Sequence, residues 1–323
     1  LLDRVEASIN DDVYPAYELF INYFSELEAK AGDDHGFWHL PDGDVVYKLS
    51  LRLFTTTSYT PDEIHETGLA EVARIQAEML ELFEAEGIDV SQGYAEAMDA
   101  YSSRPEFYYE DSDEGRQQIL DDYQAILDEL NAGLDAAFNV RPKAGVEVLR
   151  VPQFREETAP GAYYQRPSFD GSRPGRFYAN LFDIKATPKF GMRTLAVHEG
   201  IPGHHFQIAV AMELEDMPLL RRFSFFTAYV EGWALYTEQL AWEQGLMPTN
   251  ADNIGRLNAE LFRAVRLVVD TGIHHKRWTR EEAIDYMLAN AGMPESDVIS
   301  EVERYIVMPG QATAYKVGMM KIL

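Results

Sequence analysis

The stretch 58–87 has the clearest helical pattern in the chain and constrains its fold most. Thr60 can cap a helix N-terminus, Pro61 suits the first turn, and Glu63 stands where the partner of a capping box is needed. Apolar residues then recur at helical spacing and a glycine ends the run: Leu69, Val72, Ile75, Met79, Leu82 and Gly87. The segment therefore predicts one long amphipathic helix.

A second stretch repeats this arrangement. Thr279 is the predicted N-cap, Glu282 its box partner and Gly292 the helix end. Helical patterns of this kind dominate residues 1–140 and return over residues 188–323. The sequence therefore predicts a mainly α protein.

Residues 145–185 have a different character. The segments GVEVLRVPQF and GRFYANLFDI are rich in β-forming residues, and SFDGSRPG between them is rich in turn formers. We expect a small β ribbon of two or three strands here. Because no repeat or flexible linker interrupts the chain, we predict a single domain over 1–323.

The composition excludes several classes of protein. A net charge of −26 argues against nucleic acid as a partner, because phosphates require Lys and Arg. No apolar run is long enough to span a bilayer. The chain begins LLDRVEASIN, without an initiator Met or a signal pattern, so we expect a protein truncated at its N-terminus. The compartment and the oligomeric state stay open, with the cytoplasm slightly favoured.

The absence of cysteine means that any transition-metal site must use His, Asp and Glu. HEGIPGHH, residues 198–205, nearly matches the HExxH pattern of helical zinc sites. In a regular helix, His204 would point about 120° away from His198, and His205 would lie about 10 Å along the axis. Pro202 and its flanking glycines break a regular helix, because proline lacks an N–H and clashes with the preceding turn. A bulge or kink there would return His204 to His198.

A third ligand is available on the predicted helix 225–245. Glu231 and Glu238 lie seven residues apart on one face, among aromatic residues, where an unpaired carboxylate would be costly. Two histidines, one glutamate and an open position are the usual set for a hydrolytic zinc ion, and Glu199 would then be the general base for the water. The alternative is a polar helix turn whose histidines and glutamates have structural partners. Spacing alone leaves both open.

The chain also resembles a known family. The blocks LAVHEGIPGHHFQ, YVEGWALYTEQL, RAVRLVVDTGIHHKRW and ERYIVMPGQATAYKVG are similar to those of the DUF885 family, in family order, and correspond to its C-terminal portion. The resemblance implies a large helical, zincin-like body of the oligopeptidase and carboxypeptidase Taq type, with metallopeptidase activity. It implies His198, His204 and Glu231 as zinc ligands and Glu199 as the catalytic base.

Further residues are candidates for catalysis or substrate binding. Tyr315 and His274 are candidate donors to a developing oxyanion, each with a packing role as the alternative. Arg263 and Arg266 lie on one helical face, where they would bind a substrate carboxylate or join an internal salt-bridge network. We expect that helix to end at Gly272.

Tyr164 and Arg166 precede the second predicted strand and are candidate substrate-binding residues, because a strand edge can hydrogen-bond an extended peptide. Our leading hypothesis is a zinc-dependent peptidase of the exopeptidase or oligopeptidase type that acts on short peptides. We then expect residues 1–140 to form a helical wall of the active-site cleft, the β ribbon of 145–185 to lie near that cleft, and the helices of 188–323 to carry the metal site. One alternative is a zinc hydrolase of a small non-peptide amide. Another is a non-catalytic protein that binds peptides with the same fold, which the presence of Glu199 disfavours.

Overall fold

The computed structural model describes residues 1–323, which divide into two compact units, Leu1–His35 and Gly36–Leu323. The first unit contains α1 (Leu2–Ser8), a π-helical turn (Ile9–Val13) and α2 (Tyr14–Glu28), and none of these residues is buried. The sequence pattern predicted one continuous domain over residues 1–323. The structure separates the first unit because its helices contribute no side chain to a hydrophobic core.

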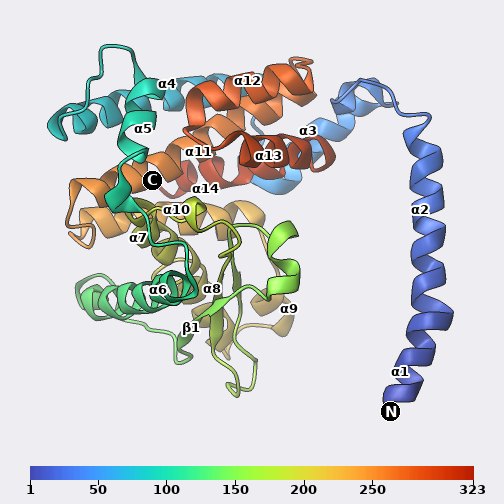
Figure 1. The fold of residues 1–323 in the computed structure, drawn as a ribbon, viewed down its shortest axis with the longest axis horizontal. Coiled ribbons are helices and arrows are strands. Elements are labelled where there is room, and N and C mark those ends of the chain that lie inside the picture. Colours follow the sequence, from blue (N-terminus) through green and yellow to red (C-terminus); the bar gives the residue numbers. More distant parts are fainter. The chain divides into compact units, whose positions relative to one another are not determined.

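The second unit is mainly helical, as predicted, with a small sheet (Figure 1). Before the sheet come α3 (Gly43–Thr55), α4 (Pro61–Ala85), α5 (Tyr94–Ser102) and α6 (Asp113–Gly133). After it come α7 (Lys189–Glu199), α8 (His204–Glu213), α9 (Leu219–Phe223), α10 (Thr227–Glu243), α11 (Asn250–His274), α12 (Arg280–Ala291), α13 (Glu295–Val307) and α14 (Ala314–Ile322). In Figure 1, α7 and α10 lie between an upper group with α4, α11 and α12 and a lower group with α6, α8 and the sheet.

The predicted helix starts at Thr60 and Thr279 are confirmed. Each threonine side chain accepts a hydrogen bond from the N–H of the glutamate three residues later, and that glutamate accepts one from the threonine N–H. Gly292 follows α12 in the left-handed conformation, with φ 59°. The predicted helix end at Gly272 is wrong, since α11 continues past it. The indole of Trp278 occupies the place of a Cβ there, so this glycine allows a close contact instead.

The predicted β ribbon is a three-stranded mixed sheet. Strand β1 (Val146–Arg150) pairs in parallel with β3 (Gly175–Ala179), and β2 (Ala162–Gln165) pairs antiparallel with β3. The order β1-β3-β2 leaves one side of β2 without a neighbouring strand. Tyr164, which the sequence analysis placed before a strand, therefore belongs to an edge strand of its own.

Helix α11 is the centre of the helical core. It is buried along most of its length and packs against α4, α7 and α12. Asp270 on this helix accepts hydrogen bonds from the Tyr47 hydroxyl of α3, at 2.7 Å, and from the Gly310 N–H, at 2.9 Å. Lys316 of α14 forms a buried ion pair with Glu260 of α11 at 2.6 Å. These polar contacts hold α3 and α14 against the helix around which the site is built.

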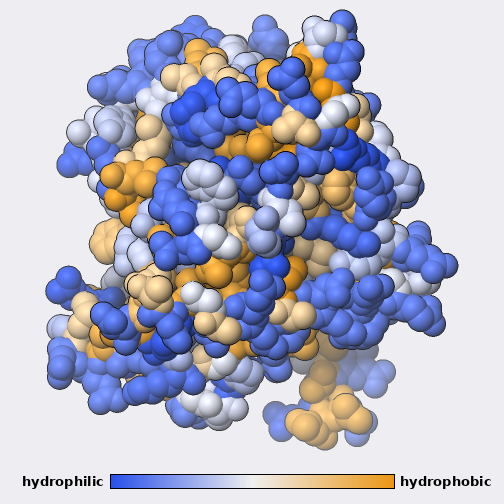
Figure 2. Space-filling model, turned by 90° about the vertical axis from the view of Figure 1, so that its left-hand side faces the viewer, coloured by the Kyte–Doolittle hydropathy of each residue, from blue (hydrophilic) through white to orange (hydrophobic).

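The face of the molecule drawn in Figure 2 is predominantly hydrophilic. Figure 2 shows polar side chains over most of one face, with apolar side chains in separate groups, in line with the net charge of −26. None of the helices combines the length and the apolar character that crossing a bilayer requires.

Candidate metal centre and substrate cavity

Residues 200–203 interrupt the helical run between α7 and α8, as the proline predicted. A Cβ at Gly203 would collide with the carbonyl oxygen of His198, so only glycine permits this return of the backbone. The indole N–H of Trp233 on α10 donates to the Pro202 carbonyl at 2.9 Å. The loop is thereby attached to the helix that carries the two glutamates.

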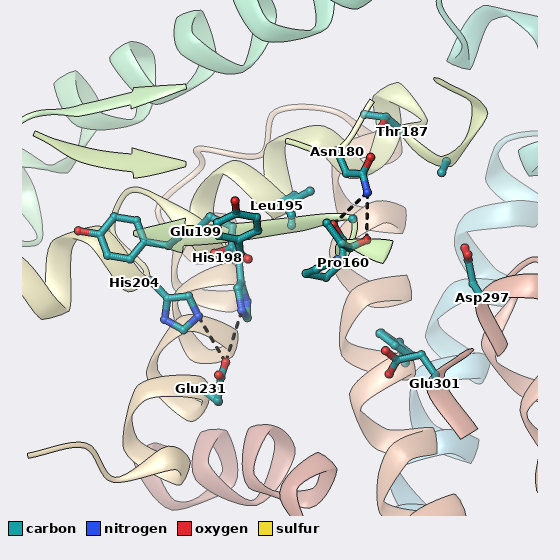
Figure 3. Close-up of a pocket in the computed structure, with 18 of the residues that line it drawn as sticks. Pro160, Asn180, Thr187, Leu195, His198, Glu199, His204, Glu231, Asp297 and Glu301 are labelled. Carbon is teal, nitrogen blue, oxygen red and sulfur yellow. Dashed lines mark hydrogen bonds and ion pairs between the residues drawn. The ribbon is translucent and has the colours of Figure 1, made fainter. Parts of the chain in front are cut away.

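The interruption brings His198 and His204 together. Their ring centroids are 4.8 Å apart, and the ring planes are nearly perpendicular at 83°. Glu231 faces both rings, with Oε2 3.3 Å from Nε2 of His204 and 3.8 Å from Nε2 of His198 (Figure 3). Glu199 lies beside them, since a carboxylate oxygen of Glu199 and one nitrogen of each histidine are within 4.8 Å of one another. The four predicted residues therefore converge.

A second carboxylate orients His198. Oε1 of Glu238, which is buried on α10, lies 2.7 Å from Nδ1 of His198. Burial disfavours the imidazolium, but the hydrogen bonds with Glu231 and Glu238 outweigh this effect and raise the pKa of His198 to about 9. Burial also disfavours the ionised form of Glu231, yet His204 and His198 hold the pKa of that carboxyl well below its usual range. The cluster stabilises both charges internally.

The chemistry of these side chains fits a zinc ion. Two imidazole nitrogens and one carboxylate oxygen are a ligand set of hydrolytic zinc sites, and here they converge without any thiolate. A ligating histidine usually has its second nitrogen bonded to an oxygen, and Glu238 supplies that oxygen for His198. Nδ1 of His204 is buried without a hydrogen-bond partner. His198, His204 and Glu231 are the residues that could hold the ion.

His205 faces away from this cluster. Its Nε2 lies 3.0 Å from the Ala144 carbonyl, to which it donates, so Nδ1 accepts from the Tyr164 hydroxyl at 3.0 Å. Burial lowers the pKa of His205 to about 4, which keeps the ring neutral. Because both ring nitrogens of His205 have hydrogen-bond partners elsewhere, the geometry favours His204 as the histidine that acts together with His198.

A cavity of about 1020 Å³ opens onto the cluster. Its lining includes the edge strand β2 and residues of α7, α10, α11 and α13, so the sheet borders the cleft as expected. In Figure 3, Glu301 and Asp297 lie across from the histidines and Glu231. The cavity is lined by residues of several elements, and it is large enough for a short peptide.

Three of the other predicted residues line this cavity, and their surroundings differ. Tyr315 lines it, and burial together with the negative charge of Glu231 raises the pKa of its phenol. Arg266 also lines it, but its guanidinium donates to Glu301 at 2.9 Å and makes the internal salt bridge that was the alternative to substrate binding. Arg263 lines the cavity without such a partner.

Tyr164 and Arg166 border the cavity from β2 and the loop that follows it. The hydroxyl of Tyr164 is bonded to His205, whereas the exposed guanidinium of Arg166 lies over the ring of Phe223 at 5.3 Å. Both positions are open to a molecule in the cavity.

The predicted catalytic role of His274 is wrong. This side chain is fully buried and does not line the cavity. Its Nδ1 accepts from the Phe37 N–H at 3.1 Å and its Nε2 donates to the Tyr305 carbonyl at 3.0 Å. Both nitrogens therefore hold the core together, and neither is free for chemistry.

Two features were missed by the sequence analysis. One is the contact of Glu238 with His198, for which the seven-residue spacing from Glu231 indicated the helix face but not the partner. The other is a second cavity of about 570 Å³, which shares His198 and Arg263 with the first. Its lining residues are scattered over helices α5, α7, α11 and α12, so no local pattern predicts it.

Fold and site together define a mainly helical protein with a buried His/Glu cluster at a large cavity. The chain belongs to the DUF885 family, described as "Bacterial protein of unknown function (DUF885)", which matches residues 1–323. Because this match spans the whole chain, it does not bear out the expectation of a C-terminal portion.

Two solved structures are similar to the chain. "The putative lipoprotein from Colwellia psychrerythraea" is 45% identical with a TM-score of 0.95, and the match covers 98% of this chain and 54% of that chain. A "putative lipoprotein of unknown function from Shewanella oneidensis" is 18% identical with a TM-score of 0.76, covering 99% and 58%, and shows the fold alone. The chain thus spans little more than half the length of either protein. No curated protein matches it.

Proposed function

We propose that this protein is a zinc-dependent peptidase with a zincin-like fold, acting on short peptides. The observation that carries the proposal is the convergence of Nε2 of His198, Nε2 of His204 and the Glu231 carboxylate beside Glu199, at the wall of a large cavity. A zinc ion held by the first three residues would polarise a carbonyl group and acidify water.

The chain's own residues supply the rest of the chemistry. Glu199 accepts a proton from the attacking water and passes it to the leaving amine, a role supported by its position next to the first ligand. Tyr315 donates a hydrogen bond to the developing oxyanion from the same cavity. The unpaired side of β2 binds the substrate main chain as an added strand, which supports an extended peptide as substrate.

The two other hypotheses use the same residues. A small non-peptide amide would need the same ligands and base, but it would leave much of the 1020 Å³ cavity and the edge of β2 without a role. A protein that only binds peptides has no need of Glu199. The description of the 45%-identical relative as a "putative lipoprotein" supports a location outside the cytoplasm, in place of the cytoplasmic one first favoured.

The first experiment combines metal analysis with a peptide digest. We expect about one zinc ion per chain in the purified protein and cleavage of a mixed peptide library, read by mass spectrometry. Glu199→Gln should retain zinc and lose about 10²- to 10⁴-fold in kcat, as expected for removal of a general base. Glu243→Gln, on the exposed end of α10, is the matched control and should behave like the wild type. Full activity of Glu199→Gln would exclude the mechanism, and a zinc-free, inactive wild type would exclude the function.

A further inference from the structure

The guanidinium of Arg263 forms no ion pair with a carboxylate of the protein, although it lines the large cavity. Helix α11 carries three arginines, and two of them are paired: Arg256 with Glu260 at 3.1 Å and Arg266 with Glu301 at 2.9 Å. Arg263 donates only to the Ala259 carbonyl of its own helix, at 3.1 Å, and its Nε is buried without a partner. In a chain with 54 acidic and 28 basic residues, an unpaired arginine in a cavity is conspicuous.

The surroundings of Arg263 do not replace a carboxylate. Apart from the Ala259 carbonyl, its charge lies near the rings of Phe262, at 5.4 Å, and Tyr315, at 6.0 Å from the guanidinium carbon. Asp297 lines both cavities without forming an ion pair with it. A partly buried cation with an unsatisfied N–H is stabilised when an anion binds, and the planar fork of arginine suits a carboxylate best.

Arg263 also lies at the junction of the two cavities. Both the 1020 Å³ and the 570 Å³ cavities are lined by Arg263 and His198, so the arginine stands between the metal-site cluster and the second space. Beside polar side chains such as Asn258, Glu238 and Asp297, apolar side chains line much of the second cavity: Met98, Phe190, Leu195, Phe262, Leu288 and Met293. An anion bound at Arg263 would therefore lie near the cluster, with an apolar space next to it.

We propose that Arg263 binds the free C-terminal carboxylate of the substrate, which makes this protein a carboxypeptidase with a preference for an apolar last residue. The proposal rests on the peptidase function proposed above. The last side chain of the peptide occupies the second cavity, and the last peptide bond lies at the cluster. Hydrolysis of that bond breaks C–N and forms C–O, with the hydroxyl of one water going to the carbonyl carbon and the proton to the amine of the released amino acid.

The test compares matched peptides that differ only at the C-terminus. N-acetylated tripeptides ending in Leu are offered as the free acid and as the amide, together with an amide whose last residue is Glu. The wild type should cleave the free acid at its last bond and cleave both amides at least about 10-fold less efficiently. Loss of one charge-assisted pair corresponds to a factor of about 10 to 100. A preference for the Glu amide would mean that a side-chain carboxylate is recognised, and it would overturn the proposal.

Substitution of the arginine should act on binding. Arg263→Gln should raise KM for the free acid about 10- to 100-fold and abolish the discrimination against the amide, whereas Arg263→Lys should keep part of that discrimination. Arg221→Gln, an exposed arginine on α9, is the matched control and should change neither. An equal effect of Arg263→Gln on acid and amide would overturn the proposal. If this variant does not fold, the wild-type comparison of acid and amide still decides.

A binding experiment separates this proposal from the peptidase function. Glu199→Gln protein is titrated by calorimetry with the acid and the amide of an N-acetylated dipeptide ending in Leu. Tighter binding of the acid, lost on adding Arg263→Gln, supports the carboxylate site independently of turnover. Cleavage of internal bonds in amidated peptides would leave the peptidase function standing and overturn this inference. Failure to bind or cleave any peptide would overturn both.

Discussion

His204 and His205 are neighbours in sequence with opposite surroundings. Nε2 of His204 lies 3.3 Å from Glu231, whereas both nitrogens of His205 are engaged by Tyr164 and the Ala144 carbonyl. We expect His204→Ala to lose zinc and His205→Ala to keep it, because only the former removes a converging nitrogen. Metal content after dialysis, measured for both variants, checks this. Zinc loss in His205→Ala alone would mean that the helix break has a different register.

Local sequence patterns predicted the helix break beside these histidines, but they did not predict contacts between distant residues. The break near Pro202 was predictable because proline and glycine act locally, through a missing N–H and a missing Cβ. The role of Glu238 was not, because its contact with His198 joins residues 40 positions apart. The catalytic role predicted for His274 was wrong for the same reason. Its hydrogen-bond partners, the Phe37 N–H and the Tyr305 carbonyl, come from distant elements and make it a core residue.

At the scale of elements, α10 and α14 approach each other at a pair of glycines. A Cβ at Gly318 would collide with the Ala228 carbonyl, and one at Gly232 would collide with the backbone of Gly318. We expect Gly318→Ala to push α14 away from α10 and to destabilise the protein by roughly 1–3 kcal/mol or more. Because α14 carries Tyr315, kcat should fall while zinc is retained. Gly145→Ala, in open space, is the control for denaturant melts, and an unchanged Gly318→Ala would refute this packing.

Helices α11 and α13 are joined by a partly buried network around Glu301. Burial disfavours its carboxylate, but Arg266 and Arg304 outweigh this effect and lower the pKa of Glu301 from 4.5 to about 2. The Glu301 carboxylate thus binds a proton less readily in the folded protein than in the unfolded chain. Its contribution to the free energy of unfolding is therefore complete above pH 4.5 and is lost as pH falls toward 2. At neutral pH this difference corresponds to on the order of 3 kcal/mol.

The variant Glu301→Gln isolates this contribution. We expect the unfolding free energy of the wild type to exceed that of the variant most above pH 5, and the difference to shrink steadily as pH falls below 4.5. Denaturant melts of both proteins between pH 7 and pH 3 measure it. A difference that stays constant over this range would mean that the Glu301 carboxylate has no such shift.

Elements differ in how well the sequence predicts them. The α4 and α12 starts were predictable because their capping boxes lie within four residues of sequence. Strand β2 was missed as a strand because it is only four residues long and owes its conformation to pairing with β3. The helix end predicted at Gly272 was wrong because the sequence does not distinguish a glycine that ends a helix from one that packs against an indole.

The burial of apolar side chains and the convergence of the site residues depend on how the helices pack in the whole molecule. The sequence predicted one domain, yet α2 keeps Tyr17, Phe20 and Phe24 exposed, since a periodic pattern reveals an apolar face but not what covers it. In the second unit, by contrast, the site residues come from five helices whose packing fixes them: α7, α8, α10, α11 and α14. Their convergence depends on the complete fold of Gly36–Leu323.

This dependence links zinc binding to global stability. The proposed zinc ligands His198, His204 and Glu231 lie on three different helices, so the unfolded chain has no comparable site. We therefore expect zinc to stabilise only the folded state. With free zinc at about 1,000 times Kd, the gain is about 4 kcal/mol. For a unit as long as Gly36–Leu323, with an unfolding entropy of about 2.1 cal/mol/K per residue, 1 kcal/mol shifts Tm by a little under about 2 °C, so a chelator should lower Tm by about 7 °C.

Calorimetry with and without chelator measures this shift, and the variants show where it arises. The Tm of His204→Ala should already be low and should not respond to chelator, because the ion has lost a ligand. Glu243→Gln, which leaves the ligands intact, should respond as the wild type does. Equal responses of His204→Ala and the wild type would place the bound metal elsewhere in the molecule. No response in either protein would mean that folding and metal binding are uncoupled, and the cluster would then be a hydrogen-bonded core feature.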